Sequence, residues 1–138
     1  DLRQLPLRSS IADAVLCIAA LHHIPGKEGR RRVLLEFKRV LKRGGHLVLT
    51  VWSLLQPKLL VKAVLHCLKS PCKVEFGDVL VPWRRREITV YRFYHLMTKK
   101  ELRSLVESCR LKVLLLAAPR KKYRVIPRNY ILVAVKEG

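Results

Sequence analysis

Several side chains in this sequence could bind a ligand or react with one. His22 and His23 directly follow an apolar stretch, and an imidazole can accept or donate a proton near neutral pH. Trp83, Arg92 and Tyr94 follow in one later segment. An arginine can hold a carboxylate through two parallel hydrogen bonds, and an aromatic ring can stack on a nucleic-acid base. As a set with interleaved arginines, these residues favour a recognition site.

Each of these residues also has an ordinary structural interpretation. A histidine after a buried strand often only caps a turn or packs against its neighbours. Trp83, Phe93 and Tyr94 are equally compatible with core aromatics on strands, because large aromatic side chains bury much apolar area. The recognition hypothesis therefore rests on the set and not on any single ring.

The charge balance favours a polyanionic partner. Lysine and arginine number 29 against 10 acids, which gives a net charge of +19. A protein that neutralises phosphates releases counterions, so nucleic acid is the partner that such a surface suits best. The alternative is a lysine- and arginine-rich surface with no partner. The expected phosphate-binding residues are Arg84, Arg85, Arg86, Lys121 and Arg124, whereas the Arg30–Arg32 run is more typical of a solvated helix face.

The first third of the chain predicts a strand, a helix and a second strand. Residues 13–20 are apolar at nearly every position, which is typical of a parallel strand buried on both faces. A helical apolar stripe spans 28–42, where Lys42 and Arg43 suit the negative end of the helix dipole and Gly44 supplies a left-handed stop. A strand at 46–52 follows, so the order implies a parallel crossover.

The remaining elements have local start and stop signals. Pro57 predicts the first turn of a helix that reaches residue 69, with Leu59, Leu60, Ala63, Val64 and Cys67 facing inward. Thr98-x-x-Glu101 is a capping box, and it predicts a helix with an apolar stripe of Leu102, Leu105, Val106 and Cys109. Two closing strands are expected near 111–118 and 129–135, around a basic loop.

Cysteine, glycine and apolar patterns exclude several classes of site. The four cysteines contain no C-x-x-C pair, so we expect no metal site, reduced thiols and a cytoplasmic protein. The longest apolar run, 113–118, is too short to cross a bilayer, so no membrane partner is expected. The six glycines form no phosphate-binding loop of either common type. Since the chain begins at Asp1, we expect it to be the C-terminal part of a larger protein.

Three segments resemble one enzyme family. Residues 1–6, 13–23 and 36–47 look like the second half of a class I S-adenosylmethionine-dependent methyltransferase. Two narrower segments, 78–83 and 91–95, are similar to the tRNA wobble-uridine carboxymethyl methyltransferases, including the methyltransferase domain fused to an AlkB-type oxygenase.

The resemblance implies an α/β fold with a partial Rossmann-like sheet, in which the N-terminal glycine-loop half is missing. Residues 1–138 would be the C-terminal part of a single methyltransferase domain. The strand at 13–20 would then pair with the strand at 46–52 on one edge and have a free apolar edge on the other, where the missing strand would pair. We expect the chain alone to bind little cofactor and to be inactive.

The resemblance also implies a reaction and its participants. S-adenosylmethionine would be the cofactor, and the product would be a methyl ester on a 5-carboxymethyl group of the tRNA wobble uridine. tRNA is therefore the expected partner, and many enzymes of this family act with a small zinc-ribbon activator subunit. By position, Asp1 and Leu2 would hold the adenine, and the backbone from Cys17 to Ala19 would approach the cofactor.

Methyl transfer to a carboxylate needs alignment more than acid–base help, because the carboxylate is already ionised near neutral pH. The expected catalytic residues are His22, Arg92, Tyr94 and His95, with Arg92 holding the carboxylate and Tyr94 or Trp83 stacking on the flipped base. Two alternatives stay open: a quinone or carboxylic-acid methyltransferase of the same fold, and a non-catalytic module that binds RNA or docks a partner.

Overall fold

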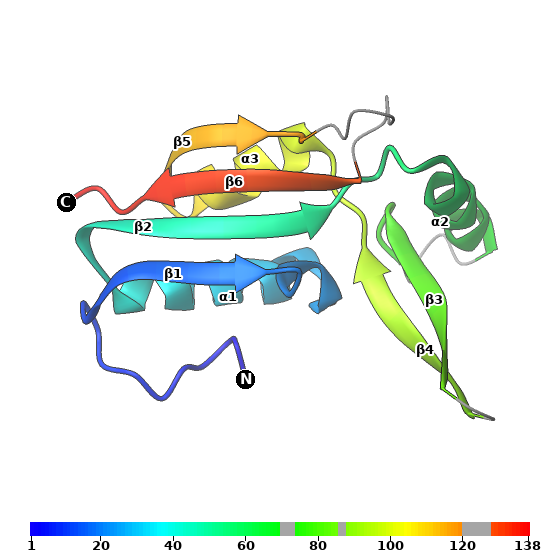
Figure 1. The fold of residues 1–138 in the computed structure, drawn as a ribbon, viewed down its shortest axis with the longest axis horizontal. Coiled ribbons are helices and arrows are strands. Elements are labelled where there is room, and N and C mark those ends of the chain that lie inside the picture. The colour runs from blue at the N-terminus through cyan, green and yellow to red at the C-terminus, as the bar shows by residue number, and fades with distance from the viewer. Residues whose placement is uncertain (70–73, 86–87, 120–127) are drawn as a thin grey trace.

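The computed structural model describes residues 1–69, 74–85, 88–119 and 128–138, and Figure 1 shows their arrangement. Helices and strands are interspersed along the chain. In order they are β1 (Ala12–Ile18), the short 3-10 helix η1 (Leu21–His23), α1 (Lys27–Val40), β2 (Leu41–Trp52), α2 (Pro57–Lys69), β3 (Asp78–Arg85), β4 (Ile88–His95), α3 (Lys99–Ser108), β5 (Lys112–Ala117) and β6 (Asn129–Val135).

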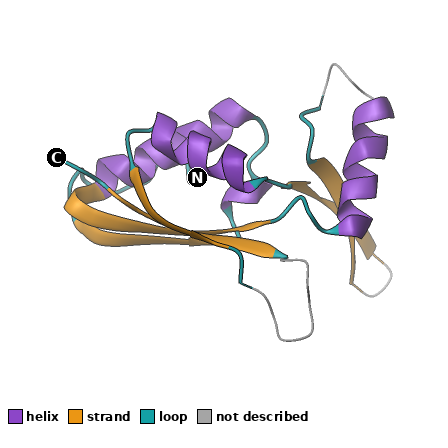
Figure 2. Ribbon diagram, turned by 90° about the horizontal axis from the view of Figure 1, so that it is seen from above, coloured by secondary structure: helices purple, strands orange, loops and turns teal. Residues whose placement is uncertain are grey.

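The main sheet has the strand order β1-β2-β6-β5. β1 and β2 are parallel, whereas β6 runs antiparallel to both β2 and β5. Figure 2 shows α1 and α3 lying over one side of this sheet, whereas α2 stands beside it. The predicted strand–helix–strand order and the two closing strands are therefore confirmed.

Helical spacing of apolar residues explains how α1 and α3 cover the sheet. The α1 stripe and the α3 stripe meet the inward side chains of β2 and β6 in one core. Its fully buried members include Val33, Leu34, Leu47, Leu49, Leu102, Val106, Leu132 and Ala134. These residues exclude water from the interface between the sheet and the two helices.

The capping box forms in part. The Oγ1 of Thr98 accepts a hydrogen bond from the backbone N–H of Glu101 at 3.1 Å, which caps α3 as predicted. The carboxylate of Glu101 is instead 2.7 Å from the Nε2 of His95. The cap therefore places an acidic side chain against the preceding strand, β4.

The expectation that the first strand is buried on both faces is wrong. Leu16 is 70% exposed and Ile18 is 57% exposed, whereas Cys17 is buried. Among the described residues β1 has a neighbour on one edge alone, and the helices cover one face of the sheet (Figure 2). The expectation of a free apolar edge on this strand is confirmed.

The expected end of the first helix is also wrong. α1 ends at Val40 and β2 begins at Leu41, so Lys42 and Arg43 belong to the strand. Gly44 has a φ of +76°, but it lies where the pairing of β2 with β1 is interrupted, not at a helix end. The left-handed conformation of Gly44 therefore belongs to an irregularity of β2 and not to a helix end.

A smaller unit stands beside the main sheet. β3 and β4 form a separate antiparallel hairpin, and α2 packs against it (Figure 1). A second apolar cluster joins them, made by Leu54, Ala63, Val79, Tyr94 and Leu96. The predicted bounds of α2 are confirmed, but of its expected inward residues only Ala63 is fully buried and Val64 is 39% exposed. None of the described helices is both long enough and apolar enough to span a membrane.

Adjacent leucines of α1 test the core. Leu34 is fully buried, whereas Leu35 is 36% exposed. We expect Leu34→Ala to lower the free energy of unfolding by about 2–5 kcal/mol, because it leaves a cavity in the core. Leu35→Ala should lose less than half as much in the same urea titration. Equal losses would contradict the packing described here.

Candidate active site at the carboxyl ends of β1 and β2

The carboxyl ends of two parallel strands meet beside η1. Ligands of open α/β sheets bind at such ends. Ala19 follows β1 there, is exposed, and has a φ of +52°, which is strained for a residue with a Cβ. Its backbone N–H is held by the Oγ1 of Thr50 at 2.9 Å. A strained, exposed backbone at this position is typical of a ligand-binding turn.

Four rings gather at the same place. The Tyr94 ring from β4 stacks on Trp52 at the end of β2, with centroids 4.3 Å apart. It also contacts His23 at 4.4 Å and His22 at 5.3 Å. The backbone carbonyl of Phe93 lies 2.9 Å from the Nδ1 of His23, which ties η1 to β4. We call these four rings, of His22, His23, Trp52 and Tyr94, the ring cluster.

The His22 imidazole is neutral and has one free hydrogen-bond donor. Burial, with a smaller contribution from His23, lowers the pKa of His22 to about 4. Its Nδ1 accepts from the backbone N–H of Trp52 at 3.2 Å, so the ring proton resides on Nε2. This Nε2 is buried and has no hydrogen-bond partner among the described residues. A buried donor without an acceptor is costly, and a ligand oxygen would satisfy it.

The residues expected to hold a cofactor fall into two groups. Ala19 is exposed at the end of β1, as that role requires, whereas the Cys17 side chain is buried in the core. Burial raises the pKa of the Cys17 thiol, so only the backbone of this residue is suited to a ligand. Asp1 forms an exposed ion pair with Arg3 at 2.6 Å, and Leu2 packs against the core.

His95, one of the expected catalytic residues, is buried between two acidic side chains. It is 1% exposed, its Nδ1 lies 2.7 Å from Asp78, and its Nε2 lies 2.7 Å from Glu101. Burial opposes the charged imidazole, but the hydrogen bonds to Glu101 and Asp78 outweigh it and raise the pKa of His95. Both nitrogens are engaged, so His95 holds three elements together: β3, β4 and α3.

Two further charged residues extend this network. Arg30 is fully buried and donates to the Glu75 carboxylate and to the carbonyl oxygen of Ile24. The interpretation of Arg30 as part of a solvated face is therefore wrong. Glu75, Asp78 and His95 have ligand-type atoms within 4.8 Å of one another, but Arg30 and His95 already neutralise these acids. Sequence reasoning missed the roles of Glu75 and Asp78, and it identified Glu101 only as a member of the capping box.

The remaining predicted site residues lie along the hairpin or outside the described part. The Arg92 guanidinium is 4.1 Å from the centroid of the Trp83 ring, so it lies over that ring and not in the ring cluster. Arg84 and Arg85 are exposed on β3. Arg86, Lys121 and Arg124 lie outside the described residues.

Comparisons with known proteins place this geometry in context. A family model described as a methyltransferase domain matches residues 1–49. A relative from Mus musculus, described as a probable tRNA methyltransferase 9B, is 36% identical over 85 residues, which are 62% of this chain and 16% of that protein. A tRNA (carboxymethyluridine(34)-5-O)-methyltransferase of Arabidopsis thaliana is 40% identical over 53 residues, or 38% of this chain and 13% of its own length.

A solved structure matches nearly the whole chain. An S-adenosylmethionine-dependent methyltransferase from Methanosarcina mazei superposes with a TM-score of 0.80 and 27% identity, covering 99% of this chain and 65% of its own. The matches to the two tRNA methyltransferases span less than a fifth of either relative's length. The architecture shared with the Methanosarcina mazei structure therefore covers the described elements. Most of each tRNA methyltransferase lies outside its match to this chain.

The His95 contacts predict a pH dependence of stability. A raised folded-state pKa means that charged His95 stabilises the fold fully below the unfolded value of 6.5, and that this contribution is lost as the pH rises through the folded-state pKa. The difference in unfolding free energy between the unsubstituted chain and His95→Gln should therefore be larger at pH 6 than at pH 9. His46→Gln, at an exposed histidine of β2, is the control and should show a flat difference. A His95→Gln difference that grows with pH would contradict the assignment.

Proposed function

We propose that this chain is a class I S-adenosylmethionine-dependent methyltransferase, and that residues 1–138 are the C-terminal part of a methyltransferase domain that acts on tRNA. The proposed reaction is esterification of a 5-carboxymethyl group on the wobble uridine. The names of the relatives support tRNA as the substrate class, and one of them names carboxymethyluridine. Dependence on a small activator subunit stays a prediction from the sequence resemblance.

The ring cluster is the observation that carries the proposal. It lies at the carboxyl ends of β1 and β2, and it combines stacked aromatic rings with the unpartnered Nε2–H of His22. Stacked rings suit a planar base, and a neutral donor suits a carboxylate oxygen. A neutral donor aligns the carboxylate without the charge neutralisation that would reduce its nucleophilicity.

The bound cofactor, S-adenosylmethionine, supplies a methyl group on a positively charged sulfur. The exposed backbone at Ala19 fits a polar ligand at this edge. The sequence resemblance adds Asp1, Leu2 and the backbone of Cys17 as the other residues that would hold the cofactor. The cofactor would supply its methyl group to a substrate carboxylate that is already ionised. No proton is moved, so this chain contributes orientation and exclusion of water.

Substrate choice tests the reaction. The chain, and any longer product of the same gene, would be incubated with S-adenosylmethionine and three acceptors: an anticodon stem-loop with 5-carboxymethyluridine, the same stem-loop with uridine, and free carboxylic acids. We expect an alkali-labile methyl ester on the first acceptor alone. Equal methylation of the free acids by the active form would overturn tRNA as the substrate class.

Substitution of His22 tests the proposed donor. His22→Phe keeps a ring and removes Nε2–H, so kcat/KM for the carboxymethylated stem-loop should fall about 10- to 100-fold in the active form, the range expected for a hydrogen bond to a charged group. His22→Gln can offer an amide N–H and should recover part of the loss. Thermal melting of both variants controls for folding. An unchanged kcat/KM in a folded His22→Phe variant would remove His22 from the site.

A further inference from the structure

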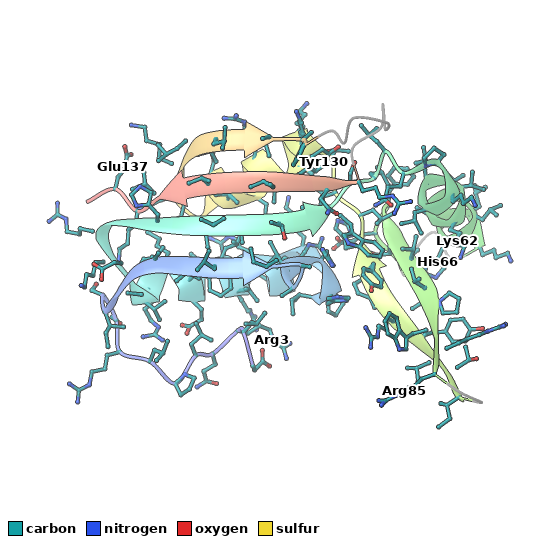
Figure 3. All side chains as sticks on the ribbon, in the orientation of Figure 1. Arg3, Lys62, His66, Arg85, Tyr130 and Glu137 are labelled. Carbon is teal, nitrogen blue, oxygen red and sulfur yellow. The ribbon has the colours of Figure 1, made fainter. Side chains whose placement is uncertain are left out.

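We infer that the outer half of the β3–β4 hairpin is a subsite for a nucleotide that flanks the target uridine, with Trp83 as its stacking platform. The inference deepens the proposed function and rests on it for the identity of the target base. The outer half of the hairpin runs from the Val81–Arg92 pair to Arg85, and it extends away from the main sheet (Figure 3).

The strand register divides the hairpin into two faces. Residues directly opposite one another share a face, and successive residues of a strand alternate. The pairs Val81–Arg92, Trp83–Val90 and Arg85–Ile88 therefore lie on one face, and we call it the Trp83 face. The pairs Pro82–Tyr91 and Arg84–Thr89 lie on the opposite face.

The Trp83 face is hollow and open. Its outer members, Trp83, Arg85, Ile88, Val90 and Arg92, line a hollow of about 500 Å³. Trp83 is 51% exposed and Val90 is 53% exposed, so the hollow has an apolar floor that nothing in the described chain covers. At the base of the same face, Val79 and Tyr94 are buried against α2, so the open surface begins beyond the ring cluster.

The chemistry of this hollow matches a single-stranded nucleotide. The Arg92 guanidinium lies 4.1 Å from the Trp83 ring centroid, which holds the indole in place and sets a positive charge beside it. Every exposed charged side chain on the described hairpin strands is an arginine, and the acid Asp78 is buried at the base. An aromatic platform beside arginines is the arrangement that single-stranded nucleic acids use for stacking and phosphate contact.

Trp83 is too far from Tyr94 to contact the same base. Val90, the partner of Trp83, lies four positions from Tyr94, and a strand rises about 3.3 Å per residue, so the two residues are attached about 13 Å apart along the hairpin. A stacked base occupies about 3.4 Å. The sequence left open whether Trp83 or Tyr94 stacks on the flipped base. We assign Tyr94 to the target base and Trp83 to a neighbouring nucleotide.

The test is a binding cycle on labelled anticodon stem-loops that carry 5-carboxymethyluridine at the wobble position. Fluorescence anisotropy would give Kd for the chain and for Trp83→Ala, which should bind about 5- to 100-fold more weakly because a stacked base is lost. Both titrations would then be repeated with stem-loops that each carry one abasic nucleotide, at a different loop position in each. When the abasic nucleotide is at the flanking position that stacks on Trp83, Trp83→Ala should no longer change Kd. If the effect of Trp83→Ala is lost when the wobble position itself is abasic, the target base stacks on Trp83 and the flanking subsite is overturned.

Two matched variants control for general loss of surface. Tyr91→Ala removes a ring that is 65% exposed on the opposite face, and its Kd should change less than twofold. Arg85→Ala should weaken binding more than Arg84→Ala, because the two adjacent exposed arginines point to opposite faces. Equal effects of Trp83→Ala and Tyr91→Ala, or no effect of Trp83→Ala on RNA binding, would overturn the inference.

Because the readout is RNA binding and not methyl transfer, its outcome is separable from that of the proposed reaction. A chain that binds the stem-loop through Trp83 but produces no ester would contradict the reaction alone. A chain that forms the ester with an unchanged Kd in Trp83→Ala would contradict the flanking subsite alone.

Discussion

The buried contact of His95 with Asp78 and Glu101 is the interaction that orients the rest of the candidate site. It ties β3 and β4 to the first turn of α3, in addition to the backbone pairing of β3 with β4. Arg30 extends the network to α1 through Glu75, so the hairpin is fixed to both helices that cover the sheet. Removing one member of such a network leaves buried charge uncompensated, which is why its geometry is well defined.

Alternation along β4 converts this contact into the geometry of the site. His95 points into the ionic network, so its neighbour Tyr94 must point to the other face. There Tyr94 stacks on Trp52 and contacts the histidines of η1. The same alternation continues outward and places Trp83 and Arg92 on the face of Tyr94. The strand register therefore places Tyr94, Arg92 and Trp83 on the face opposite to His95.

The sequence predicted the elements with local signals and missed the features that depend on distant partners. Pro57 and the Thr98 cap are local, and the helices that they begin were predicted correctly. Arg30 was interpreted as solvated because its neighbours are basic, but its partner Glu75 is 45 positions away. The exposure of β1 could not be inferred from its apolar composition, because that composition does not report how many neighbours the strand has. The aromatic and arginine residues of the hairpin were identified as a set, but dividing them between two positions required the strand register.

The central claim is that a neutral His22 presents Nε2–H to a ligand oxygen at the ring cluster. The ring ¹⁵N resonances of His22, followed by NMR during addition of a stem-loop carrying 5-carboxymethyluridine, test it most directly. The account predicts a neutral Nε2–H tautomer at pH 6.5, and a shift of the Nε2 resonance with the carboxymethylated RNA but not with the unmodified one. An imidazolium at that pH, or an Nε2 resonance that responds equally to both RNAs, would contradict it.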